Sequence, residues 1–310
     1  MLALVIREYE SRDAPGAAAL VADGSPWLTT PAGLDHQVRT RPARAKRRSW
    51  VAEEDGEIVG WAEAEFEWST EAADAADVWV FARDDQRGRG IGGELYDLGA
   101  EHLLGEGASE LLGQAGDAAG RRFVERRGYV KTRDEVLSSV DPRTIDTSRL
   151  EEELEQLDRD GFRLVTLAEA ERRPRELHAL YASAAVDMPA DHPQSNLPYE
   201  DWLAETLGKP DLSRGGSFVV LAGDRPVALS FLDVDPERGV AEQELTGTAP
   251  DHRRRGLARA AKLAVARWCA ENGIVRLSTS NDDENAGMLK INRDLGFAPT
   301  EMWSTYVLRV

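Results

Sequence analysis

Apolar and polar positions follow two periodic patterns along the chain, and the same order of these patterns occurs twice. Short runs with a period of two predict strands, and apolar residues three and four positions apart predict helices. In the first half, strands are predicted at residues 3–9, 50–53, 58–66, 78–81, 111–112 and 129–140. In the second half, strands are predicted at residues 162–166, 218–221, 227–231, 242–248 and 274–279. Helical patterns lie between them, so we predict an α/β chain with a mixed sheet.

The two halves also share their turns, which indicates a duplicated domain. Asp55-Gly56 closes a hairpin in the first half, and Gly223-Asp224 closes one at the matching place in the second. A repeat with so long a period is typical of two domains and not of a solenoid. Pro142 and the polar residues after it interrupt the pattern. We therefore predict a first domain at 1–141, a linker and helix at 142–160, and a second domain at 161–310.

Composition and charge exclude several classes of protein. A chain of 310 residues with 42% hydrophobic content is long enough for two domains with cores of their own. The net charge of −18 argues against nucleic acid or an anionic membrane as the main partner. It is compatible with a cationic substrate, or simply with solubility. The single cysteine, Cys269, allows no internal disulfide, and neither it nor the histidine spacing indicates a metal site. No apolar run approaches the ~18 residues of a membrane span, so we expect a cytoplasmic monomer or homodimer.

One stretch combines a strand end, a basic turn and a helix start. The strand stops at Pro250, three arginines and a glycine follow, and apolar residues at helical spacing begin at Leu257. A helix start leaves about four backbone N–H groups without partners and carries partial positive charge. Gly256 lets a phosphate approach the backbone, and the arginines add hydrogen-bond donors. The turn therefore suits a pyrophosphate, although a capped surface helix with a solvated basic turn would show the same pattern.

The first half contains a second copy of this turn. Arg87-Gly88-Arg89-Gly90-Ile91-Gly92 repeats the spacing of Arg253-Arg254-Arg255-Gly256-Leu257-Ala258. Both turns resemble the acyl-CoA pyrophosphate loop of the GCN5-related N-acetyltransferases (GNAT), whose pattern is Arg/Gln-x-x-Gly-x-Gly/Ala. The second copy continues through Asn281 and Asn285 to a helix that ends in Leu295-Gly296-Phe297, which is similar to the next motif of this family. The first copy contains only a degenerate version of that motif.

This resemblance implies two tandem GNAT domains, each a mostly antiparallel sheet flanked by helices with a splayed pair of central strands. It implies acetyl-CoA as co-substrate and a small-molecule primary amine as acceptor, without a metal. The residues it assigns to acyl-CoA binding are Thr246, Gly247, Thr248, Arg253, Arg254, Arg255, Gly256, Leu257, Ala258, Asn281, Asn285, Phe81, Arg87, Gly88, Arg89, Gly90, Ile91 and Gly92. For the asparagines, helix capping by Asn281 or Asp282 is the alternative.

Acyl transfer to an amine requires a held thioester carbonyl, a neutral amine and a stabilised oxyanion. The resemblance places a polarising backbone N–H at Gly247 or Thr248, and a carboxylate that takes the amine proton on the same strand. Glu244 is the candidate base and Glu242 the reserve, because a period of two puts both on one face together with Thr246 and Thr248. The alternative is that one or both glutamates only face solvent.

The first domain keeps the phosphate-binding turn but not the base. When the two basic turns are aligned, Val78 falls opposite Glu244, and Asp77, one position away, would point to the other face. We therefore predict that the C-terminal domain is catalytic, and that the N-terminal domain binds acyl-CoA unproductively or only shapes the substrate cleft. Many GNAT enzymes have a tyrosine acid where this chain has Asn292, whose side chain donates a hydrogen bond but is no general acid at neutral pH.

The acceptor itself is left open by the sequence. The two-domain plan is similar to that of mycothiol synthase, so an amine on a small sugar-linked molecule is one acceptor, and an antibiotic or amino-acid amine is another. The proline-rich loop at 187–199 lies where the resemblance places the acceptor-binding segment. Two alternatives come from other classes: a non-catalytic sensor of acyl-CoA, and a scaffolding protein in which both turns are vestigial.

Overall fold

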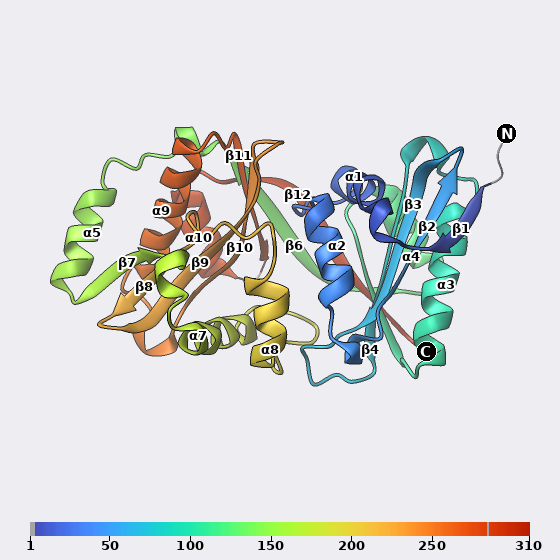
Figure 1. The fold of residues 1–310 in the computed structure, drawn as a ribbon, viewed down its shortest axis with the longest axis horizontal. Helices are drawn as coiled ribbons and strands as arrows, with labels where there is room; N and C mark the ends of the chain where they lie inside the picture. Colours follow the sequence, from blue (N-terminus) through green and yellow to red (C-terminus); the bar gives the residue numbers. More distant parts are fainter. Residues whose placement is uncertain (1–3, 284) are drawn as a thin grey trace. The chain divides into compact units, whose positions relative to one another are not determined.

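The first half of the sequence builds a sheet of five strands with helices on both faces (Figure 1). The structure is a computed structural model and describes residues 4–283 and 285–310. The strands are β1 (Val5–Glu8), β2 (Arg48–Glu54), β3 (Glu57–Phe66), β4 (Ala75–Ala82) and β5 (Glu110–Ala115). The helices are α1 (Ala14–Gly24), α2 (Pro31–Thr40), α3 (Ile91–Gly105) and α4 (Ala118–Glu125). The predicted first strand began at Ala3, which lies outside the described residues.

The second half repeats this order of elements. Its strands are β7 (Phe162–Thr166), β8 (Phe218–Ala222), β9 (Arg225–Asp235), β10 (Val240–Thr248) and β11 (Arg276–Asp282). Its helices are α5 (Leu150–Arg159), α6 (Leu167–Ala170), α7 (Pro174–Val186), α8 (Tyr199–Trp202), α9 (Leu257–Glu271) and α10 (Ala286–Asp294). The duplicated α/β pattern predicted from the sequence is confirmed.

Each sheet is completed by a strand from the other half of the sequence. β12 (Ala298–Arg309) pairs antiparallel with β5 through residues 304–309, and β6 (Val130–Val140) pairs antiparallel with β11 through residues 135–140. The chain accordingly divides into two compact units. Unit 1 runs to Asp134 and includes Leu203–Pro210 and Trp303–Val310, and unit 2 consists of Glu135–Trp202 and Asp211–Met302. These units do not coincide with the linear boundaries predicted from the sequence, because the last strand of each half pairs in the other sheet.

A splayed pair of parallel strands lies at the centre of each sheet, as the resemblance implied. In unit 1, β4 and β5 pair only from Ala75 to Asp77, although β4 continues to Ala82. In unit 2, β10 and β11 pair only from Val240 to Gln243, although β10 continues to Thr248. Other pairings within each unit are antiparallel. The parallel strands therefore part before the basic turn that follows β4 or β10, and we call this parting the opening of the sheet.

β10 of unit 2 has a β-bulge that its counterpart in unit 1, β4, does not have. Gln243 pairs with Leu232 and Thr246 with Ser230, so β10 has one residue more than β9 between these two pairs. β4 pairs with β3 from Ala76 to Ala82 without any shift of register. A bulge leaves the extra residue unpaired and bends its strand. The bulge therefore distinguishes unit 2 at the strand that carries the predicted base.

Apolar side chains cover both faces of each sheet. In unit 1, α3 packs on one face through Leu95 and Leu103, and α1 and α2 cover the other face around Trp61 (Figure 1). In unit 2, α9 packs on β8, β9 and β10 through Leu263, while α7 packs on β9 and β10 through Ala184, next to Gly247. Both basic turns are therefore held by a helix whose remaining length is anchored in a core.

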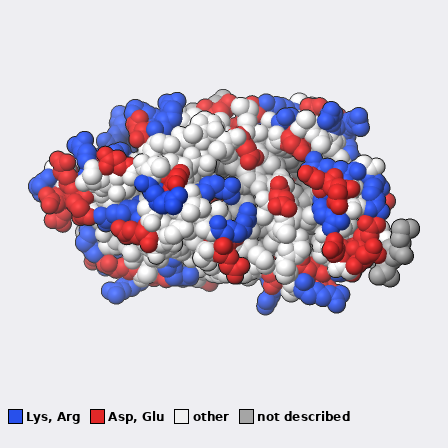
Figure 2. Space-filling model, turned by 90° about the horizontal axis from the view of Figure 1, so that it is seen from above, with Lys and Arg blue, Asp and Glu red and all other residues white. Residues whose placement is uncertain are grey.

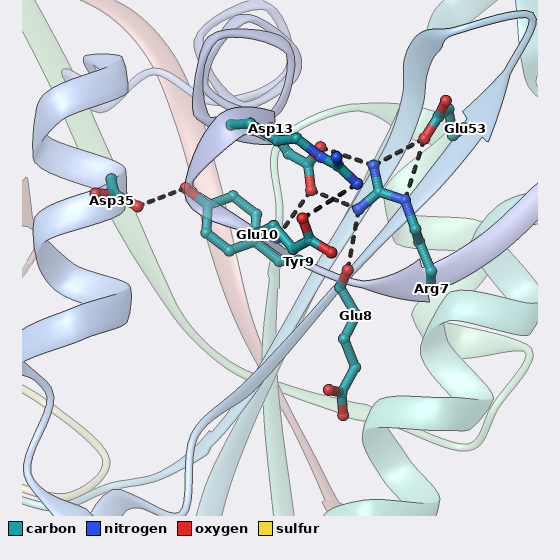
Figure 3. A network of polar contacts seen from close by, with 8 residues as sticks. Arg7, Glu8, Tyr9, Glu10, Asp13, Asp35 and Glu53 are labelled. Atoms are coloured by element: carbon teal, nitrogen blue, oxygen red, sulfur yellow. Dashed lines mark hydrogen bonds and ion pairs between the residues drawn. The ribbon is translucent and has the colours of Figure 1, made fainter.

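A polar network fixes the start of unit 1 (Figure 3). Arg7 on β1 donates to both carboxylate oxygens of Asp13, at 2.6 and 2.7 Å, and to Glu53 on β2 at 2.8 Å. Burial alone would raise the pKa of Asp13, but hydrogen bonds from Arg7 and from the backbone of Glu10 outweigh it and hold this pKa below its ordinary value. The network joins β1, β2 and the start of α1.

Candidate functional site

Both basic turns present uncapped helix starts. The residues before α3 and α9 are Gly90 and Gly256, and neither helix has a side-chain cap. Two residues of each turn have positive φ: Gly88 (81°) and Gly90 (92°) in unit 1, and Arg254 (63°) and Gly256 (79°) in unit 2. Left-handed residues next to a helix start turn successive amides toward one point, which forms a nest for an anion. The geometry of both turns thus fits a phosphate group.

The arginines of the two turns are in different environments. In unit 1, Arg87 is 2.8 Å from both Asp84 and Asp117, and Arg89 pairs with Glu54 at 2.7 Å. These carboxylates neutralise the turn and would repel a phosphate.

In unit 2, only one of the three arginines has a carboxylate partner among the described residues. Arg253 pairs with Asp187 at the end of α7 and donates to the Thr248 carbonyl at 3.3 Å. Arg255 lies over the Phe162 ring, 5.8 Å from its centroid. Within residues 4–283 and 285–310, neither Arg254 nor Arg255 forms an ion pair. Two guanidinium groups therefore remain available beside the α9 start, which makes the turn of unit 2 the better anion site.

The bulge changes which side chains of β10 share a face. The sequence pattern predicted Glu242, Glu244, Thr246 and Thr248 on one face. Thr246 instead lies 2.9 Å from the Ser230 hydroxyl, which also accepts from Gln243 at 3.3 Å. Thr246 therefore shares a face with Gln243, and the predicted alternation is wrong beyond the bulge.

Glu244 lies on the opposite face of β10, towards α7. It is exposed, and its Oε1 accepts a hydrogen bond of 3.0 Å from the Tyr181 hydroxyl. Glu242 is 9% exposed and pairs across the strands with Asp233. The structure thus places Glu244 at the unpaired part of β10 and Glu242 deeper in the sheet, and their roles as base and reserve stay predictions.

Backbone amides of β10 face the opening of the sheet. Ala249 donates its N–H to the Val227 carbonyl at 2.8 Å, and Thr248 pairs in register with Ala228. Because donors alternate along an antiparallel strand, the Gly247 N–H points to β9 and the Thr248 N–H points away from it. Of the two residues predicted to polarise a carbonyl, Thr248 has the amide directed into the opening.

Asn281 in β11 and the two asparagines after this strand have structural roles in this arrangement. Asn292 is 2% exposed, and its Nδ2 donates to Asn281 Oδ1 at 2.5 Å. Asn285 caps α10 by accepting from the Met288 N–H at 3.2 Å. The alternative that Asn281 or Asp282 is the cap is therefore wrong, because Asn285 fills that position. Asn292 occupies the predicted place of a general acid but is held in the interior by Asn281.

Register corrects the comparison of the two units. Asp77 pairs with Leu112 and Glu242 pairs with Ser278, and these are matching places in the two parallel ladders. The distance along the chain from Asp77 to Glu242 is one position shorter than the distance between the basic turns, and the bulge supplies that extra position. Asp77 is therefore the counterpart of Glu242 and not a residue on the opposite face. Glu244 lies in the bulge and has no counterpart in β4.

Indole rings fill the equivalent region of unit 1. Trp27 belongs to the segment between α1 and α2. The centroid of its ring lies 5.8 Å from that of Trp79 on β4 and 5.0 Å from that of Trp303 on β12. The Trp303 ring covers Gly116, where an added Cβ would overlap it. Phe81, which was predicted to contact the cofactor, stacks on Trp79 with 6.3 Å between the ring centroids. Trp27 thus bridges β4 and β12, the strand that pairs with β5.

Carboxyl groups crowd together on the same face of unit 1. Asp77 lies opposite Glu65 across the strands, and desolvation together with Glu67 and Glu65 raises the pKa of Asp77 well above its ordinary value. Arg41 binds Glu65 at 2.7 Å and Glu205 at 2.6 Å. An internal guanidinium therefore occupies this acidic position in unit 1.

Besides the bulge, further features of the structure were not predicted from the sequence. In the sequence Tyr181 lies among apolar residues at helical spacing, and the available signal was its hydroxyl, which needs a polar partner when the ring is buried. Nothing in the sequence pattern around Trp27 or Trp303 indicated that their rings would lie together. Lys262, 1% exposed on α9, lies in the sequence between Ala261 and Leu263, and its placement in an apolar run was the available signal.

Neither a membrane span nor a metal cluster is found within residues 4–283 and 285–310. No helix in that part is long and apolar enough to cross a membrane. No group of three or more His, Cys, Asp or Glu side chains there is arranged to hold a metal ion. On the face drawn in Figure 2, basic and acidic side chains are interspersed.

Comparison with known proteins identifies the family. A profile of the Acetyltransferase (GNAT) family matches residues 10–129 and 177–297. A tandem GNAT protein from the clavulanic acid biosynthesis pathway has a TM-score of 0.73 and 17% identity, over 99% of this chain and 98% of that one. A GCN5-related N-acetyltransferase from Sphaerobacter thermophilus has a TM-score of 0.67 and 16% identity, over 99% and 95%.

A third structure is a GCN5-related glucosamine N-acetyltransferase region of a fungal multi-domain β-N-acetylglucosaminidase. It has a TM-score of 0.64 and 16% identity, over 99% of this chain and 38% of that one. No curated protein sequence matches significantly. At these identities the solved structures show the fold, and the profile shows the family in both halves. The chain therefore belongs to the GNAT acetyltransferase family, as a tandem member with one GNAT domain in each half.

Proposed function

We propose that unit 2 transfers an acetyl group from acetyl-CoA to a primary amine of a small molecule, and that unit 1 does not catalyse this reaction. The observation that carries the proposal is the bulged end of β10, where Glu244 lies at the opening of the sheet beside a basic turn with two available arginines. Unit 1 has neither feature, since β4 is unbulged and Arg87 and Arg89 are paired with carboxylates.

The turn of unit 2 supplies the binding energy for the co-substrate. Backbone N–H groups at the start of α9 donate to the diphosphate, and Arg254 and Arg255 add charge-assisted hydrogen bonds. The thioester of acetyl-CoA provides the activated acyl group. The Thr248 N–H, directed away from β9, donates to its carbonyl oxygen and stabilises the oxyanion that forms.

Glu244 accepts the proton that the amine must lose. The amine nitrogen forms a bond to the carbonyl carbon, the carbon–sulfur bond breaks, and the electron pair leaves with sulfur as a thiolate. Asn292 supplies no proton, because an amide is not a general acid at neutral pH and this one is bonded to Asn281. The mechanism therefore relies on the stability of the CoA thiolate as the leaving group.

The first test measures release of free thiol from acetyl-CoA with a panel of amines that includes amino sugars, amino acids and aminoglycosides. Glu244→Gln should lower kcat by about 10²-fold or more, because it removes the proton acceptor. The affinity for CoA should change little, because the side chain of Glu244 faces α7 and not the basic turn. Equal loss of turnover and CoA affinity would give Glu244 a structural role instead.

A non-catalytic sensor of acyl-CoA is the second candidate, and the buried Asn292 favours it. A sensor would bind CoA through the turn of unit 2 but release no thiol with any amine. Absence of CoA binding by either unit would contradict both candidates and leave only a scaffolding role.

A further inference from the structure

We propose that Tyr181 is the positioning residue of the base, so that its hydroxyl fixes the orientation of Glu244 and favours its charged form. The proposal rests on the function proposed above. Its observation is the 3.0 Å hydrogen bond from the Tyr181 hydroxyl to Glu244 Oε1. No sequence motif of the chain indicated this pair, whose members lie on different elements far apart in the sequence.

The packing of α7 sets the position of Tyr181. Gly247 on β10 faces Ala184 on α7, and an added Cβ at Gly247 would overlap the Ala184 methyl group. This close approach requires glycine and holds the helix against the strand next to the bulge. The Tyr181 side chain is therefore presented to β10 beside the bulge.

Neighbouring rings restrict the Tyr181 side chain. The ring lies 5.7 Å from Phe231 on β9 and 5.9 Å from Trp202 on α8, measured between centroids. Both neighbours are 0% exposed, and Tyr181 itself is 7% exposed. A side chain packed in this way loses little further entropy when its hydroxyl forms a hydrogen bond. The hydroxyl is thus held at one place, and Glu244 is the group that adapts to it.

The hydrogen bond has two consequences for the chemistry. It fixes Oε1 and so holds the carboxylate in a defined orientation towards the amine. It also favours the charged form of Glu244, because a hydroxyl donates more strongly to a carboxylate than to a neutral carboxyl group. The elements around Glu244 carry other titratable groups as well: Glu242 on β10, Arg225, Asp233 and Asp235 on β9, Arg175, Glu176 and His178 on α7, Asp187 just after α7, and Arg253 in the basic turn.

The test compares Tyr181→Phe with wild type, and with Tyr96→Phe as the matched control. Tyr96 is buried in unit 1, and its hydroxyl lies 3.1 Å from that of Tyr129, so the control also removes a buried tyrosine hydroxyl. Tyr181→Phe should lower kcat about tenfold and shift the acidic limb of the pH–rate profile upward by about half a unit or more. The KM for acetyl-CoA should stay unchanged, and the control should keep the wild-type profile. An unshifted profile in Tyr181→Phe would overturn the proposal.

A second readout separates this proposal from the proposed function. The side-chain carboxyl carbon of Glu244 is followed by NMR through a pH titration, with its signal assigned from the Glu244→Gln variant. In Tyr181→Phe the midpoint of this titration should move to higher pH, whether or not an acceptor amine is known. A shifted midpoint without turnover would refute the proposed function alone. Turnover with an unshifted midpoint would refute the role of Tyr181 alone.

Discussion

Lys262 lies in the apolar interior of unit 2 without an ion-pair partner among the described residues. It is 1% exposed, and its ammonium group is 5.5 Å from the centroid of the Phe297 ring. Burial lowers the pKa of Lys262 to about 7. The folded protein therefore holds this side chain largely neutral at alkaline pH, whereas the unfolded chain keeps it protonated up to its ordinary value.

This difference predicts a pH dependence of stability. Between about pH 7 and pH 10 the unfolded state binds one proton more at Lys262, so the free energy of unfolding should rise with pH by about 1.4 kcal/mol per unit from this group. Lys262→Met should remove that contribution and should be more stable than wild type at pH 6. Urea unfolding at several pH values measures it, and parallel pH profiles of the two proteins would show that Lys262 is not buried as described.

At the scale of elements, the bulge and the helix packed beside it distinguish the two units. The sequence predicted the strands, the basic turns and the helix after each turn, because periodicity and glycine spacing are local signals. It did not predict the bulge, since one extra residue in β10 leaves the composition of the strand unchanged. Because of that extra residue, the sequence alignment put Val78 opposite Glu244 and predicted Asp77 on the other face of its strand.

Gly247→Ala tests the contact between β10 and α7. The added methyl group would overlap Ala184, so we expect a loss of about 1–3 kcal/mol in stability and a fall in turnover as Tyr181 moves away from Glu244. Ala184→Gly in the same chain should restore part of both. Gly287→Ala is the control, because α10 has room there and alanine favours a helix by about 1 kcal/mol. A fully stable and active Gly247→Ala protein would contradict the close packing.

At the scale of the whole molecule, each half of the chain completes the sheet of the other half. Residues 304–309 pair with β5, and residues 135–140 pair with β11. The sequence could not indicate this exchange, because an apolar strand pattern does not specify its partner. Linear boundaries at 141 and 161 therefore describe the duplication of the sequence but not the compact units.

Removal of residues 303–310 should destabilise unit 1 strongly. The deletion takes away the partner of β5 together with Tyr306 and Val307, which are 2% and 8% exposed. An unpaired β5 would also expose backbone donors and acceptors, which favours aggregation. Thermal unfolding of the truncated chain, compared with a chain that lacks only Val310, measures the effect. Equal melting temperatures would show that the terminal strand is dispensable.

The central claim is that the basic turn of unit 2, and not that of unit 1, binds acyl-CoA for catalysis. Calorimetric titration with CoA tests it most directly, in wild type, Arg255→Ala and Arg87→Ala. We predict one CoA per chain in wild type, binding weakened about tenfold or more by Arg255→Ala, and binding unchanged in Arg87→Ala. Two equivalent sites, or loss of binding in Arg87→Ala with Arg255→Ala unaffected, would contradict the account.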